Sequence, residues 1–147
     1  MIKIAIGSDH RGFLLKRKLK DSLRRQHIAL IDVGTHSDKS CDYPVFAAKV
    51  AHLVADQKVD SGILICKTGA GSAIAANKIK HIRAALCCSI KAARLARQHN
   101  NANILVMGSD FVSSHRAKRM IEEWLSARFQ AGRHTRRVAQ ISQMEED

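Results

Sequence analysis

A cysteine, a threonine and two glycines stand together directly after an apolar run of the chain. The run Gly-Ile-Leu-Ile-Cys at 62–66 is followed by Lys-Thr-Gly-Ala-Gly-Ser at 67–72. A glycine-rich turn between a strand and a helix lets backbone N–H groups converge on an anion, helped by the helix dipole. A dinucleotide fingerprint would need glycine at position 74, which is Ile74, and no Gly-Lys-Ser/Thr of a Walker loop follows. The loop therefore predicts a small-anion site, with an ordinary strand-to-helix turn as the alternative.

Cys66 closes the apolar run at the edge of this loop. A helix N-terminus and a neighbouring lysine, here Lys67, both stabilise a thiolate, and a thiolate acts as a general base or a nucleophile. The plainer interpretation is a small buried hydrophobic residue. A cysteine hydrolase with His10 or His99 as partner is a remote alternative, because no local protease signature surrounds Cys66. The chain has four cysteines and no Cys-x-x-Cys pair, so we expect reduced thiols and no metal site.

Three further sets of polar residues follow predicted elements. Asp9-His10 ends the first apolar run, where a carboxylate and an imidazole could grip sugar hydroxyls or a phosphate, or simply cap a helix. His99 and Asn100 end a predicted helix, where an imidazolium suits the dipole. Arg133 and Arg137 are four apart, so a helix places them on one face. Paired guanidinium groups suit a phosphate dianion.

The elements that would position these residues alternate between strands and helices. Strands are predicted at 2–6, 28–33, 62–66, 83–88 and 103–107, and helices at 13–26, 44–57, 72–79, 90–99, 113–128 and from about 135. This alternation predicts an α/β fold: a three-layer, doubly wound, Rossmann-like sheet of five parallel strands in the order 2-1-3-4-5. We expect one domain at 1–132 and a basic helical tail at 133–147 that helps complete the site. Ligands of such sheets bind beyond the carboxyl ends of the strands.

The charge balance is the unusual bulk property. The 147 residues carry 25 Lys and Arg against 13 Asp and Glu, a net charge of +12, which favours anionic partners. The basic residues are scattered and aromatic residues are only 4% of the chain, so nucleic-acid binding is not expected. No apolar run approaches the ~20 residues of a membrane span. No signal-peptide core is visible at the start, so we expect a cytoplasmic protein.

Several short motifs, in order along the chain, resemble one known family. The chain is similar to the type B ribose-5-phosphate isomerases and their galactose-6-phosphate isomerase relatives from about residue 2 to residue 141. The resemblance rests on Gly7-Ser8-Asp9-His10, Asp42-Tyr43-Pro44, Gly62 to Cys66, Thr68-Gly69-Ala70-Gly71, Ala75 to Lys78, Ile82 to Ala85, Arg97 to Asn100, and Gly132-Arg133-His134.

This resemblance implies a metal-independent aldose–ketose isomerisation of ribose 5-phosphate, as in the pentose phosphate pathway, without an organic cofactor. It assigns to Cys66 the base that moves a proton between C2 and C1 through an enediolate, to His99 ring opening, and to Asp9 and Thr68 assisting roles. It implies that substrate is bound by His10, Tyr43, Gly69, Ala70, Gly71, Ser72, Asn100, Arg133 and Arg137, and we place Lys67 and Asp110 in the same substrate site. It also implies homodimers, or dimers of dimers, whose active sites combine two subunits.

Two residues depart from the family pattern. Lys67 stands where the family has glycine after the cysteine, and Asp110 stands where many members have a phosphate-binding arginine. We hypothesise that Lys67 compensates for the charge lost at Asp110. The alternatives are a hexose 6-phosphate substrate (galactose or allose 6-phosphate) and an inactive paralogue that binds anionic polymers.

Overall fold

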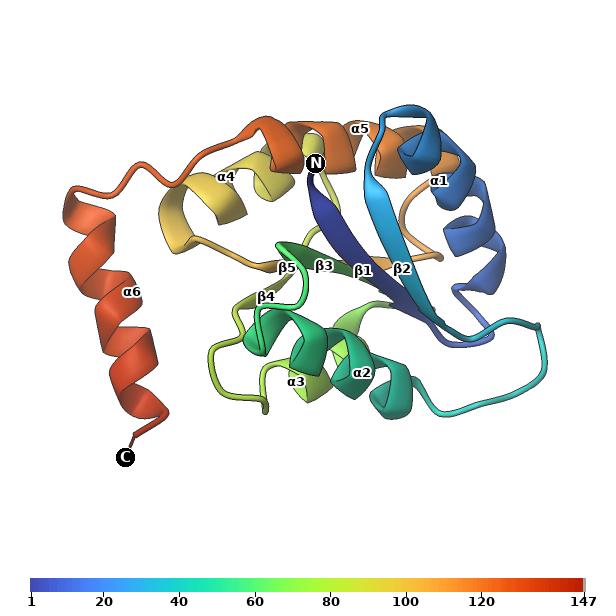
Figure 1. Ribbon diagram of the computed structural model, residues 1–147, viewed down its shortest axis with the longest axis horizontal. Coiled ribbons are helices and arrows are strands. Elements are labelled where there is room, and N and C mark those ends of the chain that lie inside the picture. Colours follow the sequence, from blue (N-terminus) through green and yellow to red (C-terminus); the bar gives the residue numbers. More distant parts are fainter. Residues whose placement is uncertain (147) are drawn as a thin grey trace.

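Five parallel strands form one sheet with helices on both faces (Figure 1). The computed structural model describes residues 1–146. The strands are β1 (Lys3–Ser8), β2 (Ala29–Gly34), β3 (Ser61–Cys66), β4 (Ala84–Leu86) and β5 (Ile104–Gly108). The helices are α1 (Phe13–Arg25), α2 (Tyr43–Ala55), α3 (Ala70–Ala76), α4 (Ile90–Asn100), α5 (Ser114–Ser126) and α6 (Arg133–Met144). Within the described residues, no helix is long and apolar enough to cross a membrane.

The doubly wound architecture predicted from the sequence is confirmed, but the predicted strand order 2-1-3-4-5 is wrong. The observed order is β2-β1-β3-β5-β4. β5 (Ile-Leu-Val-Met-Gly) is buried along its whole length and pairs with both β3 and β4, whereas none of the three residues of β4 is buried. A continuous apolar strand gains most from an interior position, and a short strand is the better sheet edge.

Two apolar cores separate the three layers. One side of the sheet packs α1, α4 and α5 through a core that includes Ile6, Leu19, Ile63, Leu105 and Trp124. The other side packs α2 and α3 through Ala5, Val50, Leu64, Ile104 and Val106. Successive side chains of β1, β3 and β5 therefore enter opposite cores. A shift of one residue in any of these strands would exchange its two faces, so the two cores fix the register of the sheet.

The outer edge of β4 is paired by a side chain. Asn77, at the end of α3, donates from Nδ2 to the carbonyl oxygen of Ala84 (2.9 Å), and its Oδ1 accepts from the Ala84 N–H (2.8 Å). The asparagine amide thus takes the place of a neighbouring strand at this position.

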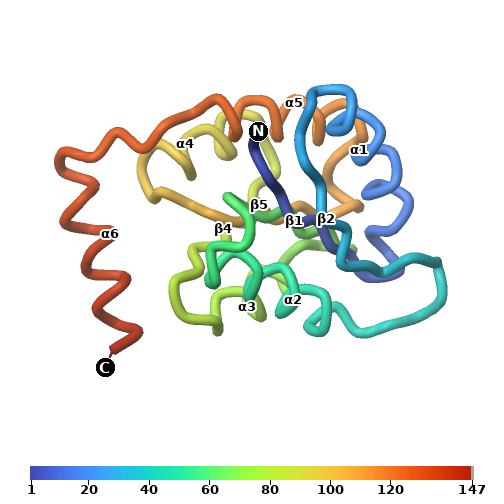
Figure 2. Tube along the Cα trace, in the orientation of Figure 1, coloured from blue at the N-terminus to red at the C-terminus, as the bar shows by residue number. Residues whose placement is uncertain are grey.

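The basic tail forms a helix at one side of the domain. Figure 2 shows α6 (orange to red) starting at the level of α4 and running toward the level of α3, and just after it Glu145 accepts from the His81 N–H (2.9 and 3.0 Å). The helix begins at Arg133, two residues before its predicted start at about 135, and His134 is its single buried residue. The side chains of Ile141 and Met144 remain exposed.

A buried ion pair fixes the loop that follows β2. Lys16, 1% exposed, donates to Asp32 Oδ1 (2.6 Å) and to the carbonyl oxygen of Thr35 (2.5 Å), and Lys20 contacts Asp32 Oδ2 (2.6 Å). Burial by itself would raise the pKa of Asp32, but the hydrogen bonds from Lys16 and Lys20 hold that pKa below its ordinary value. Burial lowers the pKa of Lys16 more than Asp32 raises it.

Replacing Asp32 by asparagine is expected to destabilise the fold by about 3 kcal/mol, because it leaves the buried Lys16 charge without its carboxylate. The folded-state pKa of Asp32 is depressed, so its stabilisation is present above the unfolded value of about 3.9 and is lost as the pH falls through the folded value. Urea unfolding of wild type and D32N at pH 7 and pH 3 measures both effects. The exposed Asp38, changed to asparagine, is the control. Equal stabilities of wild type and D32N at pH 7 would contradict the expectation.

Candidate active site

Three loops meet at the carboxyl edge of the sheet, after β1, β3 and β5. The N–H of Ser109 donates to the carbonyl oxygen of Cys66 (2.9 Å), and the N–H of Asp110 donates to that of Lys67 (3.0 Å). A Cβ at Gly108 would overlap the backbone of Thr68, so glycine is what allows these two loops to touch. The Oγ of Ser109 in turn donates to the carbonyl oxygen of Arg11 (3.2 Å). The backbone at this edge is therefore a connected surface.

Cys66 is the last residue of β3 and lies at the centre of this surface. Its Sγ accepts a hydrogen bond from the N–H of Gly69 (3.2 Å), and the side chain is 4% exposed. The sulfur therefore points toward the loop at 67–72. Cys87, directly after β4, is also buried, and burial and the neighbouring Cys88 raise the pKa of Cys87 to about 11. Cys87 accordingly stays a neutral thiol at neutral pH.

The loop turns into α3 through Gly69, whose φ of +84° is in the left-handed region. The Oγ1 of the exposed Thr68 accepts from the N–H of Ala70 (3.3 Å), which fixes the hydroxyl beside the first turn of the helix. Ala70 is exposed and Ser72 is buried. The first N–H groups of a helix have no intrahelical partner, so this turn presents donors next to the thiol.

Tyr43, the first residue of α2, closes over the same turn. Its ring lies against Gly71, where a Cβ would overlap Cε1 and Cζ of the tyrosine. The Tyr43 side chain is 40% exposed. An aromatic ring therefore lies beside the helix turn that carries the unpaired N–H groups.

Asp9 and His10 follow β1 at this edge. Asp9 Oδ1 accepts from the N–H groups of Arg11 and Gly12 (3.0 Å each), so one carboxylate oxygen caps the turn into α1. Within residues 1–146, Asp9 Oδ2 accepts no hydrogen bond, and the residue is 6% exposed. The Nδ1 of His10 accepts from the N–H of Cys41 (3.2 Å), which assigns the ring proton to Nε2 in the neutral imidazole. Asp9 therefore has a capping role and a free oxygen at once.

The remaining candidate residues lie at the other edge of the sheet. α4 runs back from the carboxyl end of β4, so His99 and Asn100 in its last turn lie near Ile104, where β5 begins. In register, Gly62 pairs with Ile104 and Cys66 with Gly108, so the two edges are about 13 Å apart along the strands. We call Asp9, His10, Tyr43, Asp110 and residues 66–72 the cysteine half-site, and His99, Asn100, Arg133 and Arg137 the histidine half-site. One copy of the chain holds the two half-sites apart.

The histidine half-site joins α4 to α6. The rings of His99 and His134 are stacked, with centroids 4.3 Å apart and planes inclined by 12°. Arg133 and Arg137 are exposed on α6. Sequence reasoning quoted His134 in the motif Gly132-Arg133-His134 but gave it no role. It also gave none to Ser8, whose buried Oγ has no hydrogen-bond partner among the described residues and lies next to Asp9.

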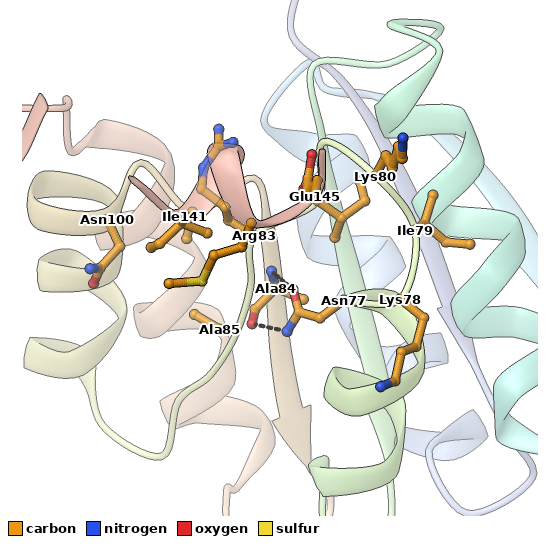
Figure 3. A pocket seen from close by; sticks show the side chains of 13 residues that line it. Asn77, Lys78, Ile79, Lys80, Arg83, Ala84, Ala85, Asn100, Ile141 and Glu145 are labelled. Carbon is orange, nitrogen blue, oxygen red and sulfur yellow. Dashed lines mark hydrogen bonds between the residues drawn. The ribbon is translucent and has the colours of Figure 1, made fainter. Parts of the chain in front are cut away.

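A hollow of about 640 Å³ lies beside the histidine half-site and away from Cys66. Figure 3 shows it between β4, the turn after α3 and the end of α6, with Asn100 and Ile141 on one side and Lys78 and Ile79 on the other. Among residues 1–146, no three His, Cys, Asp or Glu side chains gather in the way a metal ion requires.

The fold and the loop at 66–72 define the class of protein. A thiol at the end of a parallel strand, beside unpaired helix N–H groups, is the arrangement of an α/β enzyme that acts on a small anionic substrate. The chain matches the ribose/galactose isomerase family over residues 4–141. It is 46% identical over 146 residues to ribose-5-phosphate isomerase B of Escherichia coli, covering 99% of this chain and 98% of that protein. The chain belongs to the ribose/galactose isomerase family, and the resemblance in its motifs is thereby confirmed.

Solved structures agree with this assignment. A ribose-5-phosphate isomerase B of Clostridium thermocellum superposes with a TM-score of 0.97 at 48% identity, covering 99% of this chain and 98% of that one. The enzyme of Mycoplasma genitalium, solved with bound ribulose-5-phosphate, gives a TM-score of 0.94 at 42% identity, covering 99% and 97%.

Proposed function

We propose that this chain interconverts ribose 5-phosphate and ribulose 5-phosphate by moving a proton between C2 and C1. The observation that carries the proposal is the Cys66 sulfur, held at the end of β3 by the Gly69 N–H (3.2 Å) and facing the first turn of α3. The family supports the substrate class, since the E. coli relative is a ribose-5-phosphate isomerase B and the M. genitalium structure binds ribulose-5-phosphate.

The proposed chemistry starts at the cysteine half-site. The Cys66 thiolate takes the proton from C2 of the open-chain aldose, which leaves a 1,2-enediolate. The proton of the C2 hydroxyl passes to the oxygen at C1, and the Cys66 thiol returns its proton to C1, which gives the ketose. Negative charge develops on the substrate oxygen at C1, and N–H groups at the start of α3 are placed to donate to it. The Thr68 hydroxyl and Asp9 Oδ2 lie at the same edge and bind the neighbouring hydroxyl groups.

Two copies of the chain are required to complete this site. His99 opens the furanose ring and Arg133 and Arg137 hold the phosphate, yet these residues lie at the opposite edge from Cys66 in one copy. We propose a homodimer, or a dimer of dimers, in which the histidine half-site of one copy covers the cysteine half-site of the other. A two-fold axis makes two equal sites in this way. Exposed apolar side chains on α3, β4 and α6 (Ile74, Leu86, Ile141 and Met144) support such an association in the cytoplasm.

Comparison of three substrates tests the proposal. We expect kcat/KM for ribose 5-phosphate to exceed those for allose 6-phosphate and galactose 6-phosphate at least tenfold, because a pocket shaped for five carbons loses roughly 1–3 kcal/mol with a misfit group. A larger kcat/KM for either hexose 6-phosphate would favour the alternative substrate. No turnover of any of them, with DNA retention in a gel shift at ~150 mM salt, would favour an inactive paralogue that binds anionic polymers.

Lys67 is proposed to offset Asp110 at the phosphate end of this site. Both side chains are exposed on neighbouring loops that share a backbone hydrogen bond, Asp110 N–H to Lys67 carbonyl (3.0 Å). We expect Lys67→Ala to raise KM for the sugar phosphate tenfold or more, about one charge-assisted hydrogen bond, with little change in kcat. Lys78→Ala, another exposed lysine, is the control for net charge. A KM in K67A equal to that in K78A would reject the compensation.

A further inference from the structure

The rings of His99 and His134 stack on each other where the end of α4 meets the start of α6. The ring centroids are 4.3 Å apart and the planes are nearly parallel, at 12°. His134 is 8% exposed, although both of its neighbours on α6, Arg133 and Thr135, are exposed. The His134 ring is therefore the part of α6 that is inserted against the end of α4.

Stacking restrains the His99 ring in a way that hydrogen bonding would not. A hydrogen bond to an imidazole occupies one of its two nitrogens, whereas a face-to-face contact fixes the ring plane and leaves both nitrogens free. Among the described residues, no side-chain hydrogen bond involves a ring nitrogen of either His99 or His134. A residue that must donate and accept protons at a sugar ring needs this freedom.

The positively charged groups around the pair act on the pKa of His134. Arg133 and Arg137 flank His134 on α6, and His99 faces it from α4. Burial, and then the positive charges that His99, Arg133 and Arg137 can carry, lower the pKa of His134. The lowered pKa of His134 favours the neutral form of its ring in the stack.

We propose that His134 is a positioning residue: its ring holds the plane of His99 for ring opening and fixes the start of α6, which carries Arg133 and Arg137. The inference rests on the proposed role of His99 in the isomerase reaction. His134 is the single buried residue of α6, so loss of its ring frees the His99 plane and loosens the first turns of α6, while the far end of the helix stays held by the His81 N–H donating to Glu145 (2.9 and 3.0 Å).

The test compares His134→Phe with His134→Leu. Both side chains refill the buried space, but only phenylalanine supplies a flat ring. We expect H134L to lower kcat for ribose 5-phosphate about tenfold or more, a typical effect of a misoriented catalytic group, and H134F to stay within about threefold of wild type. His115→Ala, an exposed histidine on α5, is the control. Equal kcat values for H134L and H134F would overturn the proposal.

A second readout separates positioning from loss of the fold. Ribulose 5-phosphate is acyclic, because its 5-oxygen carries the phosphate and cannot close a ring on C2. Exchange of its C1 proton with D₂O needs Cys66 but no ring opening, so we expect His99→Asn to retain exchange while it loses conversion of the furanose. We expect H134L to retain exchange at saturating ribulose 5-phosphate, with a raised KM because Arg133 and Arg137 are less well placed. If H99N keeps the wild-type kcat, both the proposed role of His99 and the positioning role of His134 are wrong. If H99N loses kcat and H134L does not, only the positioning role fails.

Titration of the histidine C2–H signals provides a direct check on the pair. We expect the His134 midpoint to lie below the ordinary value of about 6.5 and to rise in His99→Asn, because the facing charge is gone. A midpoint of His134 unchanged by H99N would contradict the pairing.

Discussion

Mixing two inactive variants, Cys66→Ser and His99→Asn, is expected to restore up to about a quarter of the wild-type activity. Each site in the proposed dimer takes its cysteine half-site from one copy and its histidine half-site from the other. A heterodimer of the two variants has one site with both residues intact and one site with neither. Random exchange of subunits makes half of all dimers heterodimers, and half of their sites are active, which gives roughly 25%.

The control for this experiment pairs Cys66→Ser with Asp9→Asn. Both changes lie in the cysteine half-site, so every site of the heterodimer keeps one lesion and no activity should return. The experiment is read as turnover against time after unfolding and refolding the mixed chains together. Activity that fails to return for C66S with H99N, while heterodimers are shown by mass spectrometry, would mean that each copy builds its own site.

Changing Cys66 to serine alone is expected to lower kcat about 10³-fold or more and leave the fold intact. A serine hydroxyl does not ionise near neutral pH, so the general base is lost, an effect typically worth 10²–10⁴-fold. The serine oxygen can still accept the Gly69 N–H that now contacts the sulfur, so stability should change by less than about 1 kcal/mol.

Cys88→Ser is the matched control, because Cys88 is an exposed free cysteine on the same chain. It should keep the wild-type kcat. Retention of more than a tenth of the wild-type kcat in C66S would contradict the assignment of Cys66 as base. A loss in C88S equal to that in C66S would indicate a general sensitivity to thiol removal.

Local sequence patterns were sufficient for most of the fold. The continuous apolar run at 62–66 is a strand buried on both sides, as its composition indicates, and the last helix, predicted from about 135, begins at Arg133. The order of β4 and β5 was predicted wrongly because it depends on which strand covers more apolar surface, a comparison between distant elements. Three residues in β4, none of them buried, against five buried ones in β5 decide it.

The candidate site was less accessible from the sequence. The loop at 66–72 and Asp9-His10 are local to strand ends, so the position of the cysteine half-site at the carboxyl edge follows from the fold class. The stacking of His134 on His99 joins two helices 33 residues apart by a ring contact that leaves no periodic signal in the chain. Asp9 caps the turn into α1 with one carboxylate oxygen and leaves the other oxygen free. This division depends on the conformation of the turn, so the sequence alone did not predict it.

The central claim is that Cys66 moves a proton at C1 of a pentose phosphate, and proton exchange measures it directly. Ribulose 5-phosphate incubated in D₂O with the purified protein is followed by proton NMR at C1, beside the Cys66→Ser variant. We expect stereospecific loss of one C1 proton with the wild type and no loss above the buffer rate with C66S. Exchange that persists in C66S, or a wild type that neither exchanges the proton nor forms ribose 5-phosphate, would contradict it.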